Sequence, residues 1–170
     1  MTISPLTELY FIRHGIAAER GTHTQDEERP LTEKGRSRTQ QVAQRLKMLG
    51  CEVHCILSSP LVRAQQTTEV LLQIGISSTS VTLDDLAPSG HLQSWLTWLE
   101  QWQRQHVQSR LALVGHEPNL SSWAQHLVTG QTSDRWILKK AGVIGVQVPA
   151  AAGAIAHSHL FWLAPPRLLL

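Results

Sequence analysis

Short apolar segments alternate with helical patterns along this chain, and this alternation constrains the fold more than any other feature. Four segments of strand-like composition begin at Glu8, Cys55, Ser80 and Arg110, and each ends in turn residues. Between them, apolar residues recur at helical spacing, most clearly over residues 91–107. Strands that alternate with helices form largely parallel sheets covered on both faces. We therefore expect an α/β fold with three layers, α-β-α.

Capping residues mark the ends of the other predicted helices. Thr32 is placed to cap a helix that stops at Gly50. Ser59, followed by a proline in the first turn, is placed to cap a second helix that runs to about Gln73. A fourth helix is expected after Pro118.

The C-terminal part of the chain departs from the alternation. Residues 141–149 and 154–164 both have strand-like composition, and no helical pattern separates them. We expect an antiparallel hairpin at one edge of an otherwise mostly parallel sheet. The 170 residues are enough for one domain with a hydrophobic core. The predicted domain spans residues 1–170, with its core over about 8–163.

Charge and cysteine content exclude several classes of protein. The formal net charge of +2 is slight and spread along the chain, which is typical of neither a nucleic-acid nor a membrane-surface partner. No apolar run approaches the ~18 residues of a membrane helix, and no secretory signal is recognisable at the N-terminus. Cys51 and Cys55 lack two further ligands at zinc spacing. We expect a cytoplasmic protein with reduced thiols and no metal.

Cationic and titratable side chains follow three of the predicted strands. Arg13 and His14 follow the first strand, and Arg63 lies in the first turn of the helix after the second. His116 and Glu117 follow the fourth strand. Ligands of open α/β sheets bind beyond the carboxyl ends of the strands, so we expect these side chains to converge.

The expected group suits a phosphate ligand. Arginine binds phosphate bidentately and stays charged, and helix N-termini add free N–H groups. A cation near a helix N-terminus, such as Arg63, is unfavourable by up to ~1 kcal/mol unless an anion lies beside it. A hard metal ion would need carboxylates that are missing from these strand ends. Taken alone, Arg63 would be expected to extend into water, and only the group of residues favours a ligand.

Several motifs resemble those of the histidine phosphatase superfamily. They are "FIRHG" on the first strand, "SSPLVRAQQT" after the second and "LVGHEPNLS" late in the chain. The segments "ERPLTEKGRSR" and "LKKAGVIGV", with the chain length, are similar to the SixA-type phosphohistidine phosphatase branch. The resemblance covers residues 8 to 162 and implies a phosphoglycerate mutase-like fold.

The resemblance also implies roles for individual residues. His14 would be the nucleophile that carries a phosphohistidine intermediate, with Arg13, Arg63 and His116 holding the phosphoryl oxygens. In some relatives an arginine matching Arg29 reaches the same group. The family uses no metal or organic cofactor. In this mechanism His14 attacks as a neutral ring, whereas His116 helps most when protonated.

The origin of the proton for the leaving group separates the possible substrates. Glu117 is a candidate general acid, but its position favours the alternative role of a carboxylate that interacts with the helix N-terminus. Relatives often carry an acidic residue directly after the "RHG" motif, where this chain has Ile16. An alkyl phosphate ester needs a positioned acid, whereas the imidazole of phosphohistidine leaves easily.

Three functions follow, in order of preference. The first is removal of phosphate from phosphohistidine on a partner protein such as a phosphotransfer domain. The second is a small-molecule phosphomonoesterase or a phosphoglycerate mutase-like enzyme. The third is a phosphate-binding module without turnover, which the presence of all four motif residues disfavours.

Overall fold

The computed structural model describes residues 6–170. Within them, six strands and four α-helices alternate as the sequence predicts. The strands are β1 (Leu6–Arg13), β2 (Cys55–Ser58), β3 (Ser80–Thr82), β4 (Gln108–Gly115), β5 (Val143–Val148) and β6 (His159–Ala164). The helices are α1 (Glu33–Met48), α2 (Val62–Ile74), α3 (Leu92–Gln105) and α4 (Asn119–Thr129). No helix of this described part is long and apolar enough to cross a membrane.

All six strands form one sheet in the order β3-β2-β4-β1-β5-β6. The pairs β2–β3, β2–β4 and β1–β4 are parallel. Strand β5 runs antiparallel to both of its neighbours, β1 and β6. The mostly parallel sheet with an antiparallel edge is therefore confirmed.

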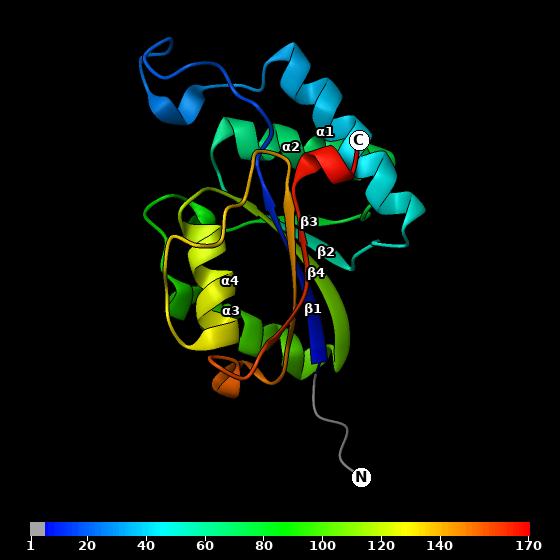
Figure 1. The fold of residues 1–170 in the computed structure, drawn as a ribbon, viewed down its shortest axis with the longest axis vertical. Helices are drawn as coiled ribbons and strands as arrows, with labels where there is room; N and C mark the ends of the chain where they lie inside the picture. Colours follow the sequence, from blue (N-terminus) through cyan, green and yellow to red (C-terminus); the bar gives the residue numbers. More distant parts are fainter. Residues whose placement is uncertain (1–5) are drawn as a thin grey trace.

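Helices cover both faces of the sheet (Figure 1). Consecutive residues of a strand point to opposite faces. Phe11 packs in the core cluster that contains α3 and α4 residues, and its ring lies 6.4 Å from that of Trp95. Ile12 packs in the cluster formed with α1 and α2. Alternate residues of β1 thus hold the two helical layers against the sheet, which confirms the three-layer α-β-α architecture.

Two predicted boundaries are wrong. Helix α2 begins at Val62, and its N-cap is Leu61 without a side-chain cap, so Ser59 is not the capping residue and the proline precedes the helix. The Ser59 hydroxyl accepts a bond from the Leu61 N–H and is otherwise bonded to a residue of another segment, His116. Strand β6 begins at His159 instead of residue 154, because residues 151–158 form a short 3-10 helix and a turn.

The predicted start of α1 is confirmed, and a close backbone contact fixes its position. The Thr32 hydroxyl accepts the Gly35 N–H at 2.9 Å. A Cβ atom at Gly35 would overlap the backbone of Ile16, which follows β1. Glycine at this position lets α1 approach the end of β1, where the predicted site residues Arg13 and His14 lie.

Candidate active site

The central strands of the sheet bring the predicted residues to one edge. Arg13 pairs with Gly115, and Ser58 pairs with Val114, so β1, β2 and β4 end at the same level. Backbone bonds continue this alignment beyond the strands, because the His14 N–H donates to the Gly115 carbonyl at 3.1 Å. The side chains of His14 and His116 therefore lie together, with ring centroids 5.2 Å apart.

The His14 ring is held in one tautomer. Its Nδ1 atom lies 2.7 Å from the Gly15 carbonyl oxygen, which can only accept a hydrogen bond. Its Nε2 atom accepts from the Nε–H of Arg63 at 3.3 Å. Both partners place the proton on Nδ1, so the lone pair of Nε2 points toward the guanidinium of Arg63. The contact between His14 and Arg63 was not predicted from the sequence.

Burial keeps both histidines neutral in the free protein. Desolvation is the main cause that lowers the pKa of His14 to about 3, and His116, Arg63 and Arg13 lower it further. Desolvation, followed by the charge of Arg63, lowers the pKa of His116 to about 4. The expectation of a protonated His116 therefore does not describe the free site. A phosphoryl dianion beside the ring would favour its protonation.

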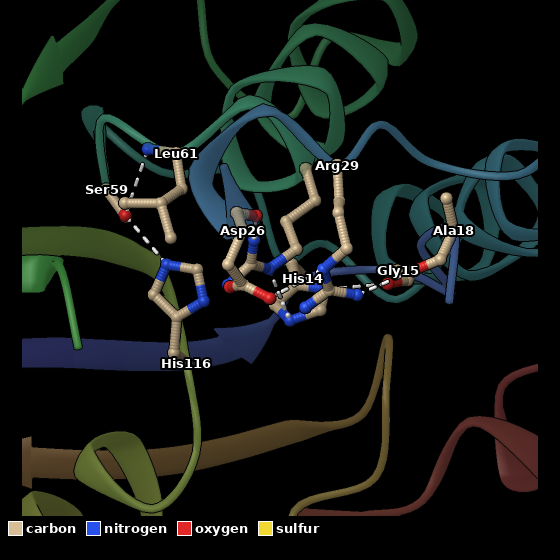
Figure 2. Close-up of polar contacts among 9 residues, drawn as sticks. His14, Gly15, Ala18, Asp26, Arg29, Ser59, Leu61 and His116 are labelled. Carbon is tan, nitrogen blue, oxygen red and sulfur yellow. Dashed lines mark hydrogen bonds and ion pairs between the residues drawn. The ribbon is translucent and has the colours of Figure 1, made fainter. Parts of the chain in front are cut away.

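His116 contacts the loop that follows β2. Its Nε2 atom lies 2.7 Å from the Ser59 hydroxyl, while its Nδ1 atom is buried without a partner among the described residues (Figure 2). A buried unpaired ring nitrogen costs free energy unless a ligand completes it. His116 therefore has one nitrogen fixed by the protein and one available for a further hydrogen bond.

Arg63 projects from the first turn of α2 and is 4% exposed. Its Nη1 donates to the Asp26 carbonyl oxygen at 2.7 Å, and its Nη2 donates to an Asp26 carboxylate oxygen at 3.0 Å. The sequence analysis expected a phosphate ligand beside this cation at the helix start. In the free protein the anion at this position is the side chain of Asp26.

Arg29 shares the same carboxylate. Its Nε donates to the other oxygen of Asp26 at 2.7 Å, and Figure 2 shows the two groups facing each other. The Nη1 of Arg29 donates to the Ala18 carbonyl at 2.6 Å. These hydrogen bonds, above all that from Arg29, lower the pKa of Asp26. The structure thus brings Arg29 and Arg63 together around one negative charge.

Asp26 is the functional candidate that the sequence analysis missed. It belongs to the acidic run of residues 26–28, which forms a short 3-10 helix and is exposed at every position. An isolated antiparallel β-bridge between Ala17 and Leu31, which we call the stem, closes this loop. The only signal in the sequence was the spacing of three residues between Asp26 and Arg29.

Arg13 faces a different side of the site. Its Nη1 donates to the Leu138 carbonyl at 3.0 Å, and its Nε is buried without a partner within the described chain. Desolvation lowers the pKa of Arg13, and the charge of Glu117 opposes that shift. The charge of Arg13 lowers the pKa of both His14 and His116, so it acts on the site electrostatically.

Glu117 is held at the start of α4. Both of its carboxylate oxygens are bonded to Ser121, one to the backbone N–H and one to the hydroxyl. Desolvation raises the pKa of Glu117. Glu117 and Arg13 line the same cavity, of about 430 Å³. The hydrogen bonds to Ser121 fit the role of Glu117 as a helix-start carboxylate, and its raised pKa fits the role of a proton donor.

The described residues offer no cluster of three or more His, Cys, Asp or Glu side chains that could hold a metal ion. The functional groups brought together are instead two neutral imidazoles and two buried arginines, Arg29 and Arg63, with Arg13 beside them. Such a group has the donors to bind a tetrahedral oxyanion and a ring nitrogen that can face it.

Sequence comparisons agree with this chemistry. The family model of the histidine phosphatase superfamily (branch 1) matches residues 9–87. An uncharacterized protein of Picosynechococcus sp. (strain PCC 7002) is 46% identical over 164 residues, which cover 96% of this chain and 99% of the relative. The phosphohistidine phosphatase SixA of Escherichia coli (strain K12) is 29% identical over 126 residues, which cover 74% of this chain and 76% of that protein.

Solved structures share the fold. A structure of the protein histidine phosphatase SixA complexed with tungstate has a TM-score of 0.83 at 24% identity, over 96% of this chain and 99% of that chain. A phosphoglycerate mutase from Bacillus anthracis has a TM-score of 0.74 at 13% identity, over 99% and 97% of the two chains. The fold is therefore phosphoglycerate mutase-like.

Proposed function

The chain belongs to the histidine phosphatase superfamily, and we propose that this phosphatase removes the phosphoryl group from phosphohistidine on a signalling or phosphotransfer protein. The main support for the proposal is that the tautomer and the orientation of the His14 ring are fixed in the free protein. Its Nδ1–H is fixed by the Gly15 carbonyl, and its Nε2 lone pair faces the Arg63 guanidinium. The nucleophile is thus neutral, oriented and placed beside the group that binds phosphoryl oxygens.

In the first step the Nε2 lone pair of His14 attacks phosphorus. A new N–P bond forms, and the N–P bond of the substrate breaks with its electron pair returning to the substrate imidazole. When the far nitrogen of that imidazole carries a proton, it leaves as a neutral ring. The positive charge that develops on His14 is stabilised through Nδ1–H by the Gly15 carbonyl, 2.7 Å away.

In the second step water attacks the phosphorylated His14. The water oxygen bonds to phosphorus, the N–P electron pair returns to Nε2, and the water proton passes to solvent or to the released phosphate. Arg63 and Arg29 would hold the equatorial oxygens in both steps once Asp26 is displaced from them. No metal or organic cofactor enters this proposal.

The surroundings of His14 support a substrate with a good leaving group. Within residues 6–170, no carboxyl group is bonded to the ring of His14 or His116. Asp26 has a lowered pKa and is a poor proton donor at neutral pH. Phosphohistidine needs little or no general acid, so this arrangement suits it better than it suits an alkyl phosphate.

One observation favours a second candidate function, hydrolysis or transfer on small phosphomonoesters. Burial raises the pKa of Glu117, and this carboxyl group shares a cavity with Arg13. A carboxylic acid with a raised pKa can protonate an alkoxide leaving group. To act in this way, Glu117 would have to leave its hydrogen bonds with Ser121.

The experiment compares initial rates on a peptide phosphorylated on histidine with rates on a panel of phosphomonoesters. We expect hydrolysis of the phosphohistidine peptide by the wild type and by Glu117→Gln at similar rates, with little turnover of the monoesters. Strong monoester turnover that collapses in Glu117→Gln would instead establish the second function.

His14→Ala tests the nucleophile in the same assay. We expect loss of hydrolysis and of the phosphoenzyme, which is detected by mass spectrometry after rapid acid-free quenching. His91→Ala is the matched control, because His91 is exposed at the start of α3 and has no side-chain capping bond. Full activity in a folded His14→Ala variant would remove the assignment.

A further inference from the structure

A second cavity, of about 740 Å³, adjoins the active site and shares Arg13 with it. We call it the basic pocket. Its walls come from the end of β1, from α1, from the segment before β5 and from the C-terminal residues, which lie beside α1 in Figure 1. The cationic residues that line it are Arg13, Arg38, Arg135, Lys139, Lys140 and Arg167.

The positive charge of the basic pocket is not compensated within the described chain. No carboxylate lines it, and none of its cationic residues forms an ion pair with another described residue. The Nε atoms of Arg13 and Arg38 are buried without hydrogen-bond partners among residues 6–170. Burial, and then the charges of Arg13 and Arg29, lower the pKa of Lys140. Cations held together in this way attract an anionic partner.

The rest of the lining is apolar, and two of its side chains are exposed. Ile137 is 62% exposed and Leu163 is 40% exposed, and Ile16 and two prolines complete the wall. Exposed apolar patches rimmed by polar residues mark interaction sites, and arginine is enriched in protein–protein interfaces. A small metabolite would be held instead by a few convergent groups in a more enclosed site.

We propose that the basic pocket docks an acidic segment of the phosphoprotein substrate, next to the histidine that carries the phosphoryl group. The inference rests on the proposed function, because it names the substrate surface that the same site recognises. Arg13 and Ile16 line the pocket and lie within two residues of His14 in the chain, so a segment that presents phosphohistidine to His14 lies close to the pocket. Aspartate or glutamate side chains of that segment would then contact Arg135, Lys139 and Arg167.

The test uses two synthetic histidine peptides that differ only in whether glutamate or glutamine flanks the histidine, each phosphorylated on the imidazole with phosphoramidate. We expect the wild type to show a kcat/KM about tenfold higher for the glutamate peptide, mainly through a lower KM, because several rim charges act together. This preference should weaken as ionic strength rises.

Charge reversal identifies the surface responsible. Arg135→Glu/Lys139→Glu should remove the preference for the glutamate peptide and leave the rate on the glutamine peptide close to that of the wild type. The matched control is Arg45→Glu/Arg104→Glu, which makes the same change in net charge at two exposed positions outside the basic pocket. The control should keep the preference.

A binding measurement separates the two proposals. Fluorescence anisotropy with the unphosphorylated glutamate and glutamine peptides reports docking without turnover. Tighter binding of the glutamate peptide that is lost in Arg135→Glu/Lys139→Glu supports the docking proposal, whether or not the phosphopeptides are hydrolysed. If neither phosphopeptide is hydrolysed, only the proposed function is overturned. Equal binding and equal kcat/KM for both peptides would overturn the docking proposal while hydrolysis itself stands.

A small anion is the alternative occupant. If Arg135→Glu/Lys139→Glu lowers turnover of 3-phosphoglycerate but changes neither binding nor hydrolysis of the glutamate peptide, the pocket holds a second anionic group of a metabolite. That outcome would overturn the docking proposal.

Discussion

The Nε–H group of Arg63 donates a hydrogen bond to Nε2 of His14 at 3.3 Å. The same guanidinium binds both the backbone and the side chain of Asp26 through its other nitrogens. One side chain therefore joins the proposed nucleophile to the carboxylate that lies beside the arginines in the free protein. This relationship makes the arrangement of the donors on Arg63, as well as its charge, important.

Arg63→Lys should lower kcat/KM for the phosphohistidine peptide about a hundredfold or more. Lysine keeps the charge but lacks the planar set of donors that reaches His14 and a bound anion together. Steady-state kinetics at neutral pH measure the effect. Arg36→Lys is the control, because Arg36 forms only a partly exposed ion pair with Glu69 at 3.8 Å. Equal rates for Arg63→Lys and the wild type would contradict the proposed role.

Asp26→Asn should tighten the binding of inorganic phosphate about fivefold. The substitution removes the negative charge that competes for Arg29 and Arg63, and we expect an ion pair whose carboxylate is half-exposed to contribute about 1 kcal/mol. Isothermal titration calorimetry measures the dissociation constant. Glu27→Gln removes a neighbouring charge of the same 3-10 helix and should leave the constant unchanged. Weaker phosphate binding in Asp26→Asn would show that the carboxylate organises the arginines instead of competing for them.

The buried histidines should make the protein less stable as the pH falls below neutrality. The pKa of His14 is lowered from 6.5 to about 3 in the folded state. Between these values the unfolded chain binds a proton that the folded chain does not, so the free energy of unfolding decreases with decreasing pH. The slope approaches about 1.4 kcal/mol per pH unit for such a group.

Urea unfolding of the wild type and His14→Asn between pH 7 and pH 5 checks this linkage. The variant lacks the titrating ring, so its stability should depend less steeply on pH, whatever its absolute stability. Parallel curves for the two proteins would contradict the lowered pKa of His14.

Gly35→Ala should destabilise the protein by about 1–3 kcal/mol, because its Cβ atom would overlap the Ile16 backbone. The displaced backbone lies two residues from His14, so activity should fall as well. Thermal unfolding and kinetics measure the two effects. Gly153→Ala is the control, since its Cβ atom would meet nothing within 4 Å. Similar effects of the two substitutions would show that the close approach of α1 is not required.

The sequence was sufficient to predict the convergence of His14, Arg63 and His116. Each residue follows a strand by one to five positions, and the carboxyl ends of neighbouring parallel strands meet at one edge. The positions of these side chains therefore depend on local patterns and on a general rule of sheet topology. Their catalytic roles remain predictions for the experiments above.

The features that were missed depend on contacts between distant segments. Ser59 has the sequence surroundings of a helix cap, but its hydroxyl is bonded to His116 at the end of β4. In the sequence Asp26 cannot be told from an ordinary solvated acidic residue, because its contact with Arg63 depends on the bridge that closes its loop. The neutral state of His116 follows from its burial to 3% exposure, which no local pattern reports.

The loop between Ala17 and Leu31 gives the anion site a composite construction. His14 and His116 directly follow strands β1 and β4, whereas Asp26 and Arg29 belong to the loop and are bonded to Arg63 and to the Ala18 carbonyl. Replacement of the loop within its stem would change which anions are admitted without altering the nucleophile. One part of the site thus belongs to the strand ends of the sheet, and the other part belongs to a loop that can be exchanged. Small changes in that loop can give the same fold new substrates.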